Sequence, residues 1–191
     1  MAIRTMHVGL GPIGSGIVRQ VAARRGFKIV ASVDIDSQKV GKDLGQVAGV
    51  DRLLRVKVTD DIGRAIEKAK PDVVVLCTSS SLKKVAEQIA EVVRRRVPIV
   101  STTEELAYPW YSNRRLAAKI DALARKAKVA ILGTGVNPGF TMDALPIALT
   151  AVCERVDTIR VDRVQNAAMR RLPFQQKIGA GLTSAEFQER V

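Results

Sequence analysis

Two adjacent glutamates, Glu104 and Glu105, follow directly after a short apolar run in the stretch VPIVSTTEELAYPW, residues 97–110. The apolar run is typical of a buried strand, so both acids lie where a strand ends. A carboxylate in such a place can take a proton from a substrate or stabilise a cation that forms during a reaction. The alternative is that both acids complement the dipole of a helix that begins there.

A second group of residues with the spacing for a binding site is Gly9-x-Gly11-x-x-Gly14, which lies between an apolar run and a helix-like segment. In a dinucleotide-binding turn the first glycine allows the tight turn, the second lets the backbone approach a pyrophosphate, and the third permits close helix–strand packing. The phosphates would lie on the N–H groups of a helix that begins near Pro12. The predicted cofactor contacts here are Gly9, Gly11, Pro12, Ile13 and Gly14, with a glycine-rich structural turn as the alternative.

Asp34 lies twenty residues after the last of these glycines, at the end of the apolar run FKIVASVDID. An acid at this point accepts hydrogen bonds from a ribose 2′-OH, which favours NAD. The polar residues 37–39, Ser-Gln-Lys, follow at once and could bind the 2′-phosphate of NADP. The sequence therefore favours NAD and allows the use of both dinucleotides, and Asp36 is a second candidate for the ribose contact.

The elements that would position these residues are apolar runs alternating with amphipathic, helix-length segments. Continuous Val, Ile and Leu runs are typical of strands buried on both faces of a parallel sheet. The expected fold class is α/β, with a doubly wound parallel (Rossmann) sheet, which binds ligands beyond the carboxyl ends of its strands. Cys77 and Thr78, after the fourth apolar run, therefore join the predicted site, and one of the three serines at 79–81 is expected to cap the next helix.

The alternation of apolar runs with amphipathic segments ends after residue 137. This change predicts a dinucleotide-binding domain over 1–137 and part of a second, α+β domain over 138–191. The stretch RVDTIRVDRVQN at 155–166 alternates in period two like a half-exposed strand, and TSAEF near the end resembles a capping box. About fifty residues are thin for an independent core. We expect a partner chain or a longer version of this chain to complete the second domain.

Composition narrows the class of function. The formal net charge of +12 attracts anions, including nucleic acid. A nucleic-acid-binding module is the weaker hypothesis, because aromatic content is 4% and no recognisable nucleic-acid motif is present; steeply salt-dependent binding would support it.

Other residue types exclude several kinds of site. His7 is the only histidine and is expected to be buried and hydrogen-bonded, so with Cys77 and Cys153 far apart no metal site is predicted. A His-centred dehydrogenase mechanism and the Tyr-x-x-x-Lys pair are both excluded. The absence of a signal peptide, a disulfide framework and an apolar run of ~20 residues predicts a soluble, cytoplasmic protein without a membrane partner.

Five stretches together resemble the 2,4-diaminopentanoate dehydrogenase family and, more closely, its relatives the amine dehydrogenases: GLGPIGSGI, VDID…VGKDLG, VVVLCTSSS, STTEELAYPW and ILGTGVNPGFTMDALP. Both groups are similar to dihydrodipicolinate reductase in their N-terminal domain. The resemblance implies an NAD(P)-dependent oxidoreductase acting on CH–NH2 donors, which reductively aminates small ketones or aldehydes with ammonia and catalyses the reverse oxidative deamination. It also implies a homodimer formed through the second domain, whose C-terminal part would lie outside this sequence.

The resemblance also implies roles for individual residues. Glu104 would be the catalytic acid and base, with Glu105 as the open alternative, and Asn137 would orient the nicotinamide carboxamide or the substrate nitrogen. The predicted walls of an apolar substrate pocket are Phe140, Leu145 and Tyr108, with Trp110 beside Glu104.

Two alternatives within this resemblance are less favoured. A 2,4-diaminopentanoate substrate would need further charged partners that the chain does not clearly supply. Dihydrodipicolinate reductases carry a His-His pair, a lysine and a PSGT segment in the second domain, and this sequence has neither the histidines nor that segment.

Overall fold

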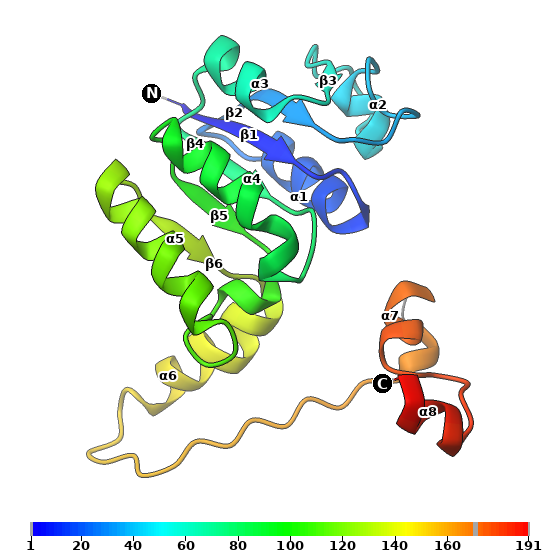
Figure 1. Cartoon of the computed structure of the whole chain (residues 1–191), viewed down its shortest axis with the longest axis vertical. Coiled ribbons are helices and arrows are strands. Elements are labelled where there is room, and N and C mark those ends of the chain that lie inside the picture. Colours follow the sequence, from blue (N-terminus) through cyan, green and yellow to red (C-terminus); the bar gives the residue numbers. More distant parts are fainter. Residues whose placement is uncertain (1, 170–171, 191) are drawn as a thin grey trace. The chain divides into compact units, whose positions relative to one another are not determined.

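The structure is a computed structural model that describes residues 2–169 and 172–190. The chain divides into two compact units, Met1–Ala151 and Val152–Val191 (Figure 1). The first unit is built on a six-stranded parallel sheet with the strand order β3-β2-β1-β4-β5-β6. This order confirms the predicted doubly wound α/β fold, because the chain runs outward from β1 to β3 and then crosses back to β4.

The strands are β1 (Ile3–Val8), β2 (Phe27–Val33), β3 (Val58–Thr59), β4 (Val73–Leu76), β5 (Ile99–Ser101) and β6 (Ile131–Gly133). The helices of the first unit are α1 (Pro12–Ala23), α2 (Leu44–Ala48), α3 (Ile62–Ala69), α4 (Leu82–Arg94), α5 (Arg114–Ala127) and α6 (Leu145–Thr150), with the short helical segments η1 (Glu104–Leu106) and η2 (Val136–Ala144). The second unit contains η3 (Ala167–Met169), α7 (Leu172–Lys177) and α8 (Ser184–Arg190).

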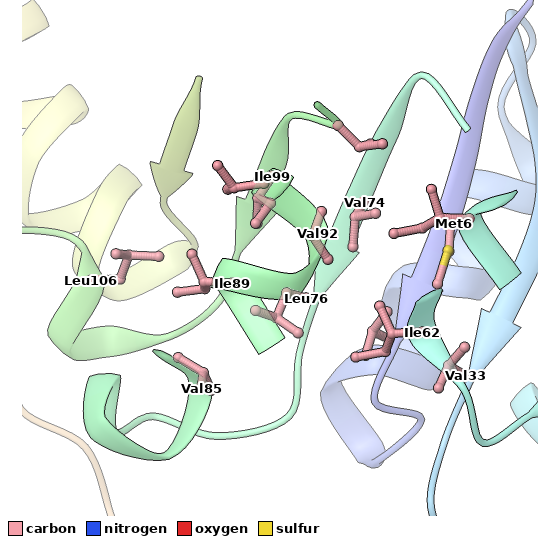
Figure 2. Packing of buried hydrophobic residues seen from close by; sticks show 14 of the residues in the cluster. Met6, Val33, Ile62, Val74, Leu76, Val85, Ile89, Val92, Ile99 and Leu106 are labelled. Carbon is pink, nitrogen blue, oxygen red and sulfur yellow. The ribbon is translucent and has the colours of Figure 1, made fainter. Parts of the chain in front are cut away.

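Two apolar clusters form the core of the first unit. In the larger one, alternate strand residues such as Met6 and Val74 pack against α3, α4 and α5. Figure 2 shows part of this cluster, with Ile89 and Val92 of α4 facing side chains of the central strands. The smaller cluster joins α1 and α2 to β3 through residues such as Val18, Leu44 and Val58. Because both clusters are continuous, the strand ends are held at defined positions, which a site at that edge requires.

Two local predictions differ from the structure. The expected third strand LLRVKV contributes only β3, because its earlier residues bond to the segment before α2: the Leu54 N–H donates to Asp43 Oδ1 and the Leu44 N–H to the Val56 carbonyl. The strand expected at 155–166 is not formed; within the described residues this segment is exposed and has no strand beside it. A period-two pattern cannot make a strand without a partner for its backbone.

The observed division of the chain lies later than the predicted junction after residue 137. Residues 138–151, including most of η2 and all of α6, group with the first unit. In the second unit, Thr183 and Glu186 form the expected capping box, in which the Thr183 N–H donates to Glu186 Oε2 at 2.9 Å and the Glu186 N–H to Thr183 Oγ1 at 3.4 Å.

His7 lies in β1 and is 1% exposed, as expected. Its Nε2 lies 3.2 Å from Thr5 Oγ1, but its Nδ1 has no hydrogen-bond partner among the described residues, so only half of the predicted hydrogen bonding is present. Burial lowers the pKa of His7 from 6.5 to about 4, because a charged imidazolium is poorly solvated there.

We predict that this histidine makes the folded chain sensitive to mild acid. Between pH 6.5 and pH 4 the unfolded chain takes up a proton that the folded chain does not, so the free energy of unfolding decreases as the pH falls. The expected loss between pH 7 and pH 5 is about 2 kcal/mol. Urea denaturation at these two pH values measures it, with His7→Gln as the non-titrating control. An equal loss in both proteins would show that His7 is not its source.

Candidate active site

The carboxyl ends of the parallel strands lie at one edge of the sheet, and most of the predicted site residues follow them there (Figure 1). The glycine turn follows β1, Asp34 follows β2, and Cys77 and Thr78 follow β4. Glu104 follows β5, and Asn137 lies in η2 after β6. The strands therefore bring the predicted dinucleotide turn and the predicted catalytic acid to the same edge.

The three glycines of the turn have different surroundings. Gly9 has φ +87°, and a Cβ there would lie 2.8 Å from the Cys77 carbonyl group. A Cβ on Gly14 would overlap the carbonyl oxygen of Gly9, so no larger residue fits. A Cβ on Gly11 would meet no atom within 4 Å. The first and third glycines are thus required by the protein's own packing, whereas the second faces open space that a pyrophosphate can fill.

Helix α1 begins at Pro12, with Gly11 as an N-cap residue that has no capping side chain. The N–H groups of a first helical turn have no partner within the helix, and they bind anions well. Ile13 is 46% exposed, so the surface over this turn is accessible. These features fit the phosphates of a dinucleotide.

Asp34 holds the glycine turn in place. Its Oδ2 accepts the Leu10 N–H at 2.6 Å and lies 3.4 Å from Lys39 Nζ, and its Oδ1 accepts the Asp36 N–H at 2.9 Å. Most of its hydrogen-bonding capacity is therefore already used inside the protein. The predicted ribose contact of Asp34 is limited to what capacity remains.

Lys39 lies between two carboxylates, 3.4 Å from Asp34 Oδ2 and 3.2 Å from Asp36 Oδ2. Burial acts to lower the pKa of Lys39, but its hydrogen bond to Asp36 and the charge of Asp34 outweigh burial and raise it. The Gln38 N–H and the Lys39 ammonium, both bonded to Asp36, lower the pKa of that carboxyl. This end of the site therefore carries both signs of charge at neutral pH.

Cys77 and Thr78 connect the glycine turn to the rest of the edge. The Cys77 N–H donates to the Val8 carbonyl at 2.7 Å, and Thr78 Oγ1 donates to Gln88 Oε1 at 2.6 Å. Burial raises the pKa of the Cys77 thiol, although its hydrogen bonds with Thr102 oppose that shift. The thiol is therefore protonated at neutral pH and is a poor nucleophile.

Glu105, the second of the two adjacent glutamates, is hydrogen-bonded to the start of α4. Glu105 Oε2 accepts the Leu82 N–H at 2.8 Å and lies 3.4 Å from both Ser81 Oγ and Asn113 Nδ2. Glu105 is therefore the acid that caps α4, and Ser81, although it occupies the N-cap position, makes no capping hydrogen bond with its side chain. For Glu105, the helix-dipole interpretation is the better one. Both acids are exposed, and the catalytic role of Glu104, with Glu105 as the alternative, stays a prediction.

The predicted substrate-side residues lie on two exposed segments. Tyr108 follows η1 and is 71% exposed, and Phe140 in η2 and Leu145 at the start of α6 are also exposed. Trp110 lines a groove with residues of α5 and β6, and this groove does not include Glu104. The wall of a substrate pocket stays a prediction for Tyr108, Phe140 and Leu145.

Sequence reasoning missed two buried hydroxyls beside Glu104. Ser101 is 0% exposed and bonds to the Leu76 carbonyl at the end of β4, and Thr103 is 1% exposed and bonds to Ser79 in the connection between β4 and α4. The run STT contains no signal that distinguishes the buried hydroxyls of Ser101 and Thr103 from the more accessible Thr102, because all three residues follow the same apolar run.

Within residues 2–169 and 172–190, no three His, Cys, Asp or Glu side chains gather where they could hold a metal ion. Over the same residues, no helix has the length and apolar character needed to cross a membrane.

Known proteins are similar to this chain in sequence and in fold. The family described as dihydrodipicolinate reductase, N-terminus, matches residues 3–134. The chain is 32% identical to 2,4-diaminopentanoate dehydrogenase of Acetoanaerobium sticklandii, over 99% of this chain and 54% of that protein. It is 30% identical to an amine dehydrogenase of Streptomyces virginiae, over 85% of this chain and 46% of that protein. The chain thus spans about half the length of the curated relatives it matches.

Solved structures agree with these relatives. The amine dehydrogenase from Mycobacterium smegmatis matches with a TM-score of 0.73 and 33% identity, over 82% of this chain and 46% of that one. A dihydrodipicolinate reductase from Paenisporosarcina sp. TG-14 matches at a TM-score of 0.57 and 22% identity, over 79% of this chain and 54% of that one, which shows the fold alone. The resemblance inferred from the five stretches is confirmed. The chain belongs to the family defined by the N-terminal domain of dihydrodipicolinate reductase.

Proposed function

We propose that this chain carries the dinucleotide site and the catalytic acid of an NAD(P)-dependent amine dehydrogenase. The reaction is the reductive amination of a small ketone or aldehyde with ammonia, together with the reverse oxidative deamination. The observation that carries the proposal is the placement of the glycine turn, with open space at Gly11, and of Glu104 at one edge of the sheet. The names of the relatives at 30–33% identity support the same chemistry.

In this proposal the dinucleotide, when bound, supplies or accepts the hydride. The chain's residues handle the nitrogen and its protons. Glu104 takes a proton from ammonium, stabilises the iminium cation by its negative charge, and assists the loss of water from the carbinolamine. A neutral side chain at this position could do none of these as well, which is why an acid is needed.

The proposed cofactor is NAD, with NADP also accepted. Asp34 favours NAD because its carboxylate repels a 2′-phosphate. Lys39 lies within 3.4 Å of both Asp34 and Asp36 and offsets part of this repulsion, which supports dual use. Parallel fluorescence titrations with NADH and NADPH distinguish the two, and NADH is expected to bind more tightly.

The proposed substrate is a small aliphatic carbonyl compound in a pocket walled by Tyr108, Phe140 and Leu145, with Asn137 orienting the nicotinamide carboxamide or the substrate nitrogen. A homodimer through the second domain and a cytoplasmic location, without nucleic-acid or membrane partners, complete the proposal. The alternative substrate is 2,4-diaminopentanoate, which the relative matching 99% of this chain favours.

Ammonia-dependent oxidation of NADH and NADPH tests the proposed function. This chain and a full-length version are assayed against a panel of small ketones and aldehydes, and in reverse with simple amines and 2,4-diaminopentanoate. The M. smegmatis amine dehydrogenase serves as the positive control. We expect turnover only when ammonia is present. Oxidation of the reduced dinucleotide that does not depend on ammonia would contradict the proposal.

A further inference from the structure

The loop that carries Glu104 is hydrogen-bonded to the connection between β4 and α4 through the buried hydroxyl of Thr103, and the buried hydroxyl of Ser101 bonds in turn to Thr103 and to the end of β4. Thr103 Oγ1 donates to the Ser79 carbonyl at 2.9 Å. Ser101 Oγ lies 2.9 Å from both the Leu76 carbonyl oxygen and Thr103 Oγ1, and it accepts the Thr103 N–H at 3.1 Å. Both hydroxyl residues are at most 1% exposed, so water does not compete for these hydrogen bonds.

Glu105, on the other side of Glu104, is also hydrogen-bonded to residues near the start of α4. The Glu105 N–H donates to the Ser80 carbonyl at 3.2 Å, and the Glu105 carboxylate accepts the Leu82 N–H at 2.8 Å. Glu104 is therefore flanked by two residues that both bond to the turn at 79–82. Because neither neighbour can shift without losing these bonds, the backbone of Glu104 has little freedom.

The backbone of β6 packs closely against η1 and the residue that follows it. A Cβ on Gly133 of β6 would lie 2.6–2.8 Å from backbone atoms of Leu106 and Ala107. Leu106 is also 7% exposed and belongs to the larger apolar cluster. The segment η1 is thus confined between β6 and the β4–α4 connection.

The same connection touches the dinucleotide turn. A Cβ on Gly9 would lie 2.8 Å from the Cys77 carbonyl and from Thr78 Cγ2, and Ser79, whose carbonyl accepts the Thr103 hydroxyl, is the next residue. A short path of contacts therefore runs from Gly9 through residues 77–79 to Thr103 and Glu104. For stability alone, an apolar pair of the same shape could replace these hydroxyls at little cost. The hydrogen bonds of these hydroxyls have a preferred direction, so they define the position of the loop at Thr103 in a way that an apolar pair would not.

We propose that Thr103 is a positioning residue whose hydroxyl sets the place of Glu104 relative to the dinucleotide turn. This inference rests on the function proposed above for Glu104. A purely structural role for Thr103 would lower stability without a separate effect on turnover, and that difference can be measured.

The test compares Thr103→Val, which keeps the shape and removes the hydroxyl, with Thr103→Ser, which keeps the hydroxyl. Thr5→Val is the matched control, because Thr5 is 2% exposed, lies in β1 of the same sheet and bonds to His7. We expect Thr103→Val to lower kcat about 10–100-fold, as a small misplacement of a catalytic group does. The KM for the dinucleotide should change less than about twofold, because the glycine turn is intact. Thr103→Ser should keep most of the activity, and Thr5→Val should lose stability but not kcat.

A second measurement does not depend on activity. Hydrogen exchange of the Glu105 and Leu106 amides should be faster in Thr103→Val and unchanged in Thr103→Ser and Thr5→Val. Wild-type kcat in Thr103→Val would overturn the proposal, as would an equal loss of kcat in Thr103→Val and Thr5→Val at equal stability. If neither the wild-type chain nor a longer version that completes the second domain shows turnover, the proposed function fails. In that case unchanged exchange in Thr103→Val overturns the proposal that the Thr103 hydroxyl fixes this loop, whereas faster exchange that is absent in Thr103→Ser and Thr5→Val supports it. Should Thr103→Val not fold, Thr103→Ala, which also removes the hydroxyl, takes its place with the same expected results.

Discussion

Replacing Glu104 with glutamine should lower ammonia-dependent turnover about 10²–10⁴-fold, the usual contribution of a general acid or base. The amide cannot take a proton from ammonium, and it carries no charge to stabilise an iminium cation. Binding of NADH should be unchanged, because Glu104 follows β5 whereas the glycine turn follows β1. Steady-state rates with a ketone and ammonia, together with an NADH fluorescence titration, measure the two effects separately.

Glu105→Gln is the matched control for this experiment. A glutamine oxygen can still accept the Leu82 N–H, which Glu105 accepts at 2.8 Å, so the cap of α4 is kept. We therefore expect a much smaller loss of turnover in Glu105→Gln than in Glu104→Gln. The reverse order of effects would transfer the catalytic role to Glu105, and full activity in both variants would remove this pair from the mechanism.

Alanine at Gly14 should prevent the dinucleotide turn from forming as observed, whereas alanine at Gly11 should leave the fold intact and weaken dinucleotide binding. The Cβ of Gly14→Ala would overlap the Gly9 carbonyl oxygen, so α1 or the turn must move. Overpacking of this kind costs about 1–3 kcal/mol or more. We expect the melting temperature to fall by about 5 °C or more.

Gly11→Ala provides the contrast, because its Cβ would meet no protein atom within 4 Å and its φ of −68° suits alanine. The melting temperature should therefore stay close to that of the wild type, while the affinity for NADH should fall at least about tenfold, because the added methyl group occupies the space for the pyrophosphate. Thermal unfolding and fluorescence titration of both variants measure these effects. Wild-type NADH affinity in Gly11→Ala would show that the pyrophosphate lies elsewhere.

Much of the fold follows from local sequence patterns. Continuous apolar runs such as Val73–Leu76 can be buried on both faces only in a covered parallel sheet, and the spacing of Gly9, Gly11 and Gly14 suits only a tight strand-to-helix turn. Predictions failed where a pattern needed a distant partner. The alternation at 155–166 specifies which side chains would share a face, but not that another strand is available to bond with it.

By itself, the sequence determined the class of sheet, the residues that follow each strand and the presence of an acid beyond β5. Only the tertiary structure decided which of the two adjacent acids caps a helix, that Asp34 holds the Leu10 N–H, and that Thr103 is a buried donor. The physical reason is the range of the interactions. Glu104 and Glu105 are equivalent in type and in local sequence, and the role of Glu105 as a cap is set by a hydrogen bond to a residue 23 positions away in the chain.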